Sequence, residues 1–304
     1  MININKEKRE IFESLSDKDI MNNKVKNYIS VTDVKAMLSS PFDGDAIAQN
    51  LVDKYYNIPD SKYYKMSKEA ILESWAYKGQ ISMQYGRLLD ECAEQLLEKQ
   101  DEDEYEMFLM DNNYDDDDRF KGNVDAMQEF IDTVIKSSGD IEYIGREIPV
   151  CYHIDNKIKP DEQDKGYYVK GRIDVLFYNK KKDRYIIIDW KSDEKIETET
   201  TKWSKPCLGP AMGHAQISWN LYTYQLYTYK MALLQNWLKD VDESKIDVFI
   251  CNCPYKQYND EHAVYKDKKF ILLPPAFKFN SEHLNKVYLF AIKKKLLMLK
   301  KDKK

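Results

Sequence analysis

The spacing of apolar residues changes near residue 140 from helical to alternating, and this change limits the fold more than any other feature. Before it, apolar side chains recur at helical spacing over 83–99 and 122–138, which predicts helices. After it, three segments alternate apolar and polar residues as strands do, namely 142–154, 167–178 and 185–191. We therefore expect an α+β protein with a helical N-terminal portion and a mixed central sheet flanked by helices.

Further elements complete this outline. Residues 179–183, Asn-Lys-Lys-Lys-Asp, would form the turn of a hairpin between the second and third strands. The remaining predicted elements are a short helix over 33–38 capped by Ser30 or Thr32, a helix over 216–239, strands over 246–253 and 270–273, and a closing helix from Ser281. We expect a helical portion over 1–140 and a core over 141–304 that together form one compact domain.

The composition indicates a folded protein without membrane segments. The 304 residues include 23 Tyr, 11 Phe and 5 Trp, too many aromatic rings for a solvated coil. The N-terminus lacks the apolar region of a signal peptide, and the longest segment without a formal charge, 206–229, contains prolines and several polar side chains. The five cysteines have no Cys-x-x-Cys spacing, as expected of reduced thiols. We expect a soluble cytoplasmic protein.

Charge is distributed unevenly along the chain. The net charge is −5, but residues 101–118 hold ten acidic side chains and no basic one, so the remainder of the chain is net basic. We expect this segment to be a solvated acidic loop, and the alternatives are that it attracts cations or imitates the charge of DNA. Nucleic acid therefore remains a candidate partner despite the negative net charge.

Charged residues on two of the predicted strands form a candidate site. Asp174 lies in the second strand, whereas Asp189 and Lys191 end the third. Residues two apart on a strand share a face at a separation of about 6.6 Å, so Asp189 and Lys191 point the same way. The pattern Asp/Glu-x-Lys occurs eight times, and only the copy at Asp189 ends a β-branched run beside a strand that carries a second carboxylate. If the two strands pair, Asp174 approaches Asp189.

This arrangement suits metal-assisted hydrolysis of a phosphodiester. Two carboxylates and the backbone carbonyl of Trp190 are hard oxygen ligands of the kind that Mg²⁺ or Mn²⁺ prefers. Lys191 could activate or position the attacking water. Lys170 and Arg172 share a strand face with Asp174, and Arg172 could contact a phosphate.

The helix over 216–239 offers two further candidates. Gln225 and Tyr229 are four residues apart, so they share a helix face and could orient Lys191, water or the DNA backbone. Structural roles remain alternatives for all of these residues. In a chain that is 33% charged, an aspartate at a strand end often serves a turn or a cap, and the tyrosines of this helix are often core residues.

Together these residues resemble the motifs of the PD-(D/E)XK nuclease superfamily, and within it the RecB-like and lambda-type exonucleases. The matching motifs are Gly171…Asp174, Asp189-Trp-Lys191 and Gln225…Tyr229. Upstream, residues 85–90 are similar to a helical segment of that branch, with Asp90 in place of a histidine. Glu147 stands where many relatives have a glutamate, and residues 30–32 followed by Ser40-Pro41 resemble the opening helix of the branch.

The resemblance implies a restriction-endonuclease-like core and a deoxyribonuclease that depends on Mg²⁺ or Mn²⁺. The catalytic residues it implies are Asp174, Asp189, Lys191, Gln225 and Tyr229. The metal ligands it implies are Asp174 and Asp189, completed or extended by Asp90 or Glu147. The candidate DNA contacts are Lys170 and Arg172. Iron–sulfur members of the branch use four cysteines, whereas here Ser40 replaces one and only Cys251 and Cys253 come late, so we expect no cluster.

By the same resemblance, we expect an exonuclease that acts on DNA ends in recombination, replication or repair, with a phage-encoded enzyme in the host cytoplasm as one candidate. A homo-oligomer and a recombination or replication partner protein stay open, and no membrane partner is expected. Two alternatives remain: a structure- or sequence-specific endonuclease, and a catalytically silent DNA-binding module on the same fold. The Asp174, Asp189 and Lys191 set disfavours the silent module, because unpaired carboxylates facing phosphate would bring it nothing.

Overall fold

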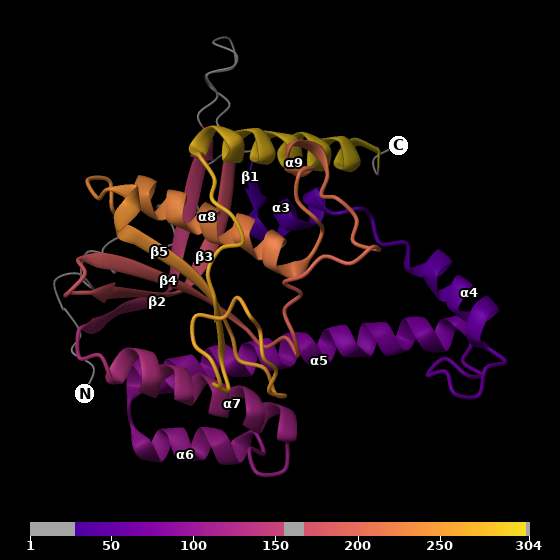
Figure 1. Ribbon diagram of the computed structural model, residues 1–304, viewed down its shortest axis with the longest axis horizontal. Coiled ribbons are helices and arrows are strands. Elements are labelled where there is room, and N and C mark those ends of the chain that lie inside the picture. The colour runs from indigo at the N-terminus through magenta and orange to yellow at the C-terminus, as the bar shows by residue number, and fades with distance from the viewer. Residues whose placement is uncertain (1–27, 155–166, 302–304) are drawn as a thin grey trace, which may run out of the picture. The chain divides into compact units, whose positions relative to one another are not determined.

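A six-stranded mixed sheet forms the centre of the computed structural model, which describes residues 28–154 and 167–301 (Figure 1). The strands are β1 (Tyr28–Ser30), β2 (Ile141–Ile154), β3 (Tyr167–Asn179), β4 (Arg184–Lys191), β5 (Ile246–Asn252) and β6 (Ile271–Leu273). Strand β3 pairs antiparallel with β2 and β4 and parallel with β1. Strand β5 runs parallel to β4 and antiparallel to β6. The predicted α+β class with a mixed sheet is confirmed.

The chain between the parallel strands β4 and β5 contains α8 (Ser218–Asn236), because parallel neighbours need a crossover connection. The antiparallel strands β3 and β4 instead meet at the predicted turn. There the side chain of Asn179 accepts a hydrogen bond from the backbone of Lys182 at 2.9 Å, and Asp183 takes a left-handed backbone conformation with φ of 50°. This turn sets the register that pairs Val175 with Ile188.

Helices cover both faces of the sheet. On β4, the ring of Trp190 packs edge-on against Phe130 of α7 (Asp118–Phe130), with ring centroids 5.3 Å apart. Its neighbour Asp189 points to the opposite face and bonds to α8. Because both faces are covered, β3 and β4 are apolar on both sides over most of their length. Most of their charged side chains enter near one end of the β3–β4 pair, whereas Arg184 lies beside the turn at the other end.

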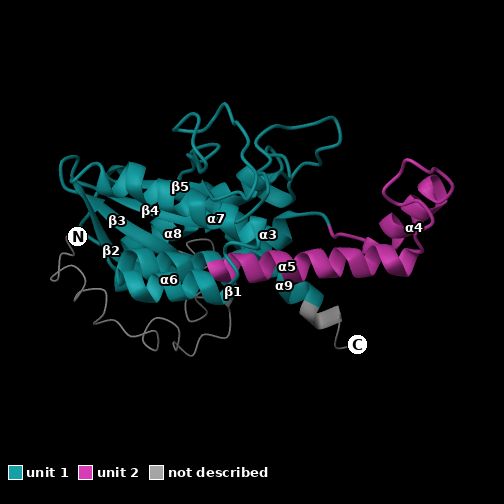
Figure 2. Cartoon of the chain, turned by 90° about the horizontal axis from the view of Figure 1, so that it is seen from below, with its two compact units in different colours: residues 1–40, 89–304 teal, residues 41–88 magenta. Residues whose placement is uncertain are grey.

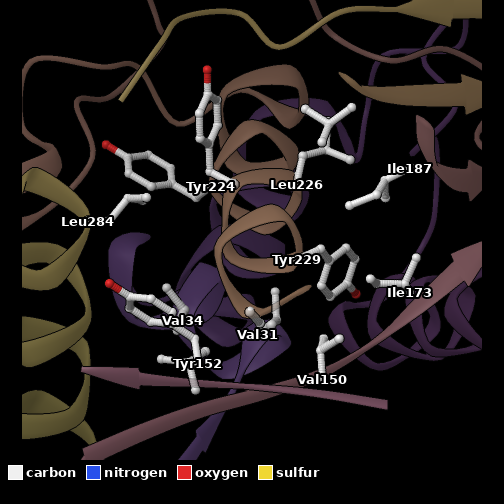
Figure 3. Packing of buried hydrophobic residues seen from close by; sticks show 14 of the residues in the cluster. Val31, Val34, Val150, Tyr152, Ile173, Ile187, Tyr224, Leu226, Tyr229 and Leu284 are labelled. Atoms are coloured by element: carbon white, nitrogen blue, oxygen red, sulfur yellow. The ribbon is translucent and has the colours of Figure 1, made fainter. Parts of the chain in front are cut away.

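The core on the α8 side is drawn in Figure 3. Tyr229 and Leu226 of α8 lie toward Ile173 of β3 and Ile187 of β4, and all four are buried. Val31 opens α3 (Val31–Leu38), which packs beside α8 and α9 (Ser281–Lys301). Burial of this kind contributes on the order of 2 kcal/mol for each large apolar side chain, so the core holds α3 and α8 against the sheet.

The prediction of a loop over 101–118 is wrong, because residues Glu102–Asp111 form helix α6. The side chain of Asp101 caps this helix by accepting a hydrogen bond from the backbone of Glu104 at 3.0 Å. Acidic residues in the first turn also favour a helix, since they face the positive end of its dipole. Phe108 then packs against Phe120 with ring centroids 5.7 Å apart. The acidic residues thus start a helix that the aromatic pair anchors.

The chain divides into two compact units, residues 1–40 with 89–304 and residues 41–88 (Figure 2). The smaller unit contains α4 (Gly44–Tyr55) and most of α5 (Lys68–Glu94), and the larger one contains α6, α7 and the sheet. This division differs from the expected boundary at residue 140. The reason is that α7 packs on the sheet through Phe130 and Asn123, which donates a hydrogen bond to the carbonyl of Cys253. No helix of the described residues is long and apolar enough to cross a membrane.

Candidate active site

The β3–β4 pair brings the two predicted aspartates together. The register pairs Val175 with Ile188, so Asp174 and Asp189 follow as neighbours one step along the ladder. The Oδ2 atom of Asp174 accepts a hydrogen bond from the backbone N–H of Trp190 at 2.7 Å, which ties the first carboxylate to the strand that carries the second. The expectation that strand pairing would bring Asp174 toward Asp189 therefore matches this register.

Asp189 is fully buried and has a partner on each carboxylate oxygen. Its Oδ1 atom accepts a hydrogen bond from the side-chain nitrogen of Gln225 at 2.6 Å, and its Oδ2 atom forms an ion pair with Lys191. The ammonium of Lys191 also donates to the carbonyl of Trp190 at 2.8 Å. Lys191 thus contacts two of the three oxygen-bearing groups that the sequence put forward as metal ligands.

The charges of this centre influence one another strongly. Burial, and then the neighbouring charge of Asp189, raise the pKa of Asp174 well above its usual value. Burial alone would lower the pKa of Lys191, but the carboxylates of Asp189 and Asp174 outweigh it and raise that pKa. Lys191 is therefore held as an ammonium. Its single positive charge lies beside two carboxyl groups, Asp174 and Asp189.

Helix α8 supplies the next layer of contacts. Gln225 and Tyr229 lie one turn apart, and the amide nitrogen of Gln225 also donates to the hydroxyl of Tyr229 at 2.9 Å. Both side chains are buried. A Cβ atom at Gly171 would come within 2.7 Å of the Tyr229 ring and 2.8 Å of Val31, so only glycine lets β3 approach the helix this closely. The structure brings Gly171, Gln225 and Tyr229 to the same centre as Asp174 and Asp189.

Asp90 and Glu147 lie at an edge held by arginines. Arg146 binds Asp90 at 2.9 Å and Glu94 at 3.2 Å, while Arg172 binds Glu147 at 3.4 Å. Glu147 falls between the ladder pairs of its neighbours and so lies opposite Asp174. Its φ of 52° is uncommon for a residue with a Cβ atom. Burial, followed by the charge of Asp90, raises the pKa of Glu147.

The two predicted DNA contacts lie on the strand face of Asp174. Arg172 is exposed over 44% of its side chain, and Lys170 is half-buried. They alternate with the buried residues Val169 and Ile173, as the strand period requires. Of the late cysteines, Cys251 and Cys253 are both buried.

Three residues join the centre that the sequence did not single out for it. Lys35 of α3 donates a hydrogen bond to the side-chain oxygen of Gln225 at 2.6 Å. The ammonium groups of Lys35 and Lys191 lie 4.7 and 4.9 Å from the ring centroid of Tyr222, whose hydroxyl donates to Asp193 at 2.9 Å. Tyr222 precedes Gln225 by three residues, so the two share a helix face, and this spacing could have predicted that Tyr222 lies near the centre. Lys35 belongs to another copy of the Asp-x-Lys pattern, and nothing local separates it from the rest.

Comparison with known proteins supplies the family. The model of the PD-(D/E)XK nuclease superfamily matches residues 62–293, more than half of the chain. The chain belongs to this family. No curated protein matches the sequence. Membership makes the protein a nuclease with DNA as its substrate class, and PD-(D/E)XK nucleases typically use divalent metal ions such as Mg²⁺.

The centre of this PD-(D/E)XK nuclease fits such an ion by its donor chemistry. Asp174 and Asp189 are adjacent carboxylates, and burial, followed by the charge of Asp189, raises the pKa of Asp174, so a cation bound between the two carboxylates would be favoured. In the described ranges, no three His, Cys, Asp or Glu side chains are already gathered into a metal-binding group. The four predicted carboxylates are thus not one cluster, because Arg146 and Arg172 hold Asp90 and Glu147 in ion pairs.

Proposed function

We propose that this protein is a deoxyribonuclease that depends on Mg²⁺ or Mn²⁺ and degrades DNA from its ends. The observation that carries the nuclease chemistry is the centre of Asp174, Asp189 and Lys191, in which Asp189 is fully buried. Gln225 binds one carboxylate oxygen of Asp189, and Lys191 binds the other. End-directed cutting is supported by the resemblance of Gln225…Tyr229 on α8 to the RecB-like and lambda-type exonucleases. A role in recombination, replication or repair follows from the same resemblance.

Asp174, Asp189 and the carbonyl of Trp190 would hold the metal ion, with Glu147 or Asp90 extending the site. When bound, a divalent ion stabilises the negative charge that develops on the phosphate and favours ionisation of water. Because the two carboxylates lie close together, they favour binding of a second cation in addition to the ammonium of Lys191. Hydrolysis forms one phosphorus–oxygen bond to water and breaks the bond to the sugar oxygen, which leaves with a proton.

Lys191 is placed to orient the attacking water or a phosphate oxygen. Its ammonium has three donors and no acceptor, and the structure uses donors on Asp189 and on the carbonyl of Trp190. Because the carboxylates raise its pKa, it donates hydrogen bonds at neutral pH instead of accepting a proton. Gln225 holds Asp189 in place, and Tyr229 holds Gln225. Arg172 and Lys170 would contact the DNA backbone on the Asp174 face.

Cleavage of end-labelled linear DNA beside a covalently closed circle tests the proposal. Both substrates are incubated with Mg²⁺, Mn²⁺ or EDTA, and Asp189→Asn is the matched control because it keeps the shape of the side chain. We expect that the wild-type protein degrades only the linear DNA and does so with either metal ion. No degradation is expected in EDTA or with Asp189→Asn. The position of the label gives the polarity.

Each other outcome changes the proposal in a defined way. Cutting of the closed circle would replace the exonuclease by an endonuclease with the same centre. Binding of DNA without cutting in any metal would replace the enzyme by a binding module. Cutting that survives Asp189→Asn would place the chemistry elsewhere in the protein.

A further inference from the structure

Lys35 reaches the active site from a distant part of the chain. Its ammonium nitrogen lies 2.6 Å from the side-chain oxygen of Gln225, a residue 190 positions later in the sequence. Helix α3 is fixed at its start by a capping box in which Ser30 and Asp33 exchange hydrogen bonds. The apolar face of α3 is buried in the core. Lys35 is therefore held by a rigid element and not by a mobile loop.

Hydrogen-bond chemistry determines which way the Gln225 amide must point. A lysine ammonium can only donate, and an ionised aspartate can only accept. Gln225 lies between one of each, with its oxygen toward Lys35 and its nitrogen toward Asp189 and Tyr229. A flipped amide would set its nitrogen against the ammonium and its oxygen against the carboxylate, and both contacts would be repulsive. Lys35 is the donor that selects the observed orientation.

Tyr222 keeps Lys35 beside this amide. Its ring receives the ammonium groups of Lys35 and Lys191 at 4.7 and 4.9 Å from the centroid. Its hydroxyl donates to Asp193 at 2.9 Å, which adds a negative charge near both lysines. Two like charges can share this region only because three aspartates lie around them.

We propose that Lys35 is a positioning residue of the active site. It holds the side-chain amide of Gln225 with the nitrogen toward Asp189, and through that amide it fixes the carboxylate of Asp189. The consequence for catalysis rests on the proposed nuclease function, whereas the orientation of the amide does not. Lys35 itself contacts neither aspartate of the centre through any hydrogen bond found in the described residues, so its influence passes through Gln225.

The side-chain amide of Gln225 can be observed directly by nuclear magnetic resonance in protein labelled with ¹⁵N-glutamine. Its signal pair is assigned by its loss in Gln225→Ala. In Lys35→Met we expect this pair to shift and to exchange with water at least roughly tenfold faster, because the amide has lost the donor that held it. An unchanged pair would overturn the proposal whatever the enzyme does.

Lys294→Met is the matched control. Lys294 is a partly buried lysine of α9 that donates to the carbonyl of Met37, on the helix of Lys35, at 2.8 Å, and it has no hydrogen bond to the centre among the described residues. This variant should leave the Gln225 signals and the cleavage rate unchanged. Melting temperatures confirm that each variant is folded, and Lys35→Gln, which also removes the charge, replaces Lys35→Met should the latter fail to fold.

Kinetics test whether Lys35 acts through Gln225. Loss of a residue that orients a ligand of a metal site typically costs about 10- to 100-fold, so kcat of Lys35→Met should fall by this factor with KM for DNA changed by less than about threefold. In the Gln225→Ala background, Lys35→Met should lower kcat by less than about twofold further. An equal fall in both backgrounds, or a raised KM with unchanged kcat, would overturn the proposal. If Lys35→Met shifts the Gln225 signal and the wild-type protein cuts no DNA, the nuclease function is refuted and the positioning role stands.

Discussion

Two groups of carboxylates lie on the larger unit, and they are neutralised in different ways. At the centre, Asp174 and Asp189 share the ammonium of Lys191, and Asp189 is fully buried. At the edge, Asp90 and Glu147 are bound by the guanidinium groups of Arg146 and Arg172, and their side chains are 37% and 34% exposed. The centre is buried and short of positive charge, whereas the edge is partly solvated and ion-paired.

The difference indicates which carboxylates are available to a metal ion. A lysine carries a compact charge on a flexible stem and can turn toward a substrate, whereas an arginine binds carboxylates through a fixed, planar fork. Carboxylates held by arginine must exchange one strong partner for another before they bind a metal ion. We therefore expect the centre to carry the chemistry and the edge to modulate it.

Of the substitutions that test this difference, Asp189→Asn should have the largest effect on cleavage. It removes the charge from the buried side chain that binds Lys191 and Gln225, so cleavage should fall by at least roughly a thousandfold. The melting temperature should change by only a few degrees because the shape of the side chain is kept. A gel time course with Mg²⁺ measures the loss. Full activity in a folded variant would remove Asp189 from the centre.

Lys35, a partly buried lysine beside the centre, should also affect stability at high pH, which the arginines of the edge cannot do because they stay protonated. Burial, and then the charge of Lys191, lower the pKa of Lys35 from 10.5 to about 8. Between these values the unfolded chain holds a proton that the folded protein has lost, so this group makes the fold more stable as pH rises from 8 to 10.5. The full effect is about 3 kcal/mol.

Denaturant unfolding of wild type and Lys35→Met at several pH values measures this contribution. The difference between the two free energies of unfolding cancels the tyrosines that lie away from Lys35, because these titrate equally in both proteins. We expect the difference to move in favour of wild type by up to about 3 kcal/mol across this range. A difference that does not change with pH would mean that Lys35 is not held as a buried cation.

Glu147→Gln and Asp90→Asn, compared as a pair, test the edge. Each removes one charge from an arginine-bound carboxylate and keeps its shape. If the edge only extends the metal site, either change should lower Mn²⁺ affinity and cleavage by about tenfold, far less than Asp189→Asn. Calorimetric titration with Mn²⁺ and the gel assay measure both. If either variant lost as much cleavage as Asp189→Asn, that residue would belong to the centre, and the distinction between the centre and the edge would be wrong.

Arg172→Gln should have the smallest effect. If this partly exposed guanidinium contacts one phosphate, its loss should weaken DNA binding by about threefold and reduce the slope of log affinity against log salt by about 1. Fluorescence anisotropy with Asp189→Asn, which does not cut the probe, measures both quantities between low and moderate salt. An unchanged slope would mean that Arg172 serves contacts within the protein, such as its ion pair with Glu147, and does not contact DNA.

The local parts of the site follow from residue spacing along single strands and helices. Alternation along β3 and β4 with the turn at 179–183 predicted that Asp174 approaches Asp189 if the two strands pair, and the observed register meets this condition. The spacing of Gln225 and Tyr229 was enough to put them on one helix face. Helix α6 was missed because the ten acidic residues of 101–118 were interpreted as a solvated loop. The two features that favour a helix there, the cap at Asp101 and the aromatic contact of Phe108, were not used.

Which distant groups complete the centre depends on how the helices pack against one another and on the sheet. Lys35 and Gln225 meet because α3 and α8 pack against each other, and Asp90 meets Arg146 through an ion pair between α5 and β2. No local sequence pattern predicts either contact. Lys35, for example, belongs to one of eight Asp/Glu-x-Lys triplets, and nothing in its own triplet distinguishes it. Spacing along a strand or helix fixes which residues share a face. Which faces come together depends on the burial of apolar side chains across the whole fold, and that physical difference separates the two kinds of prediction.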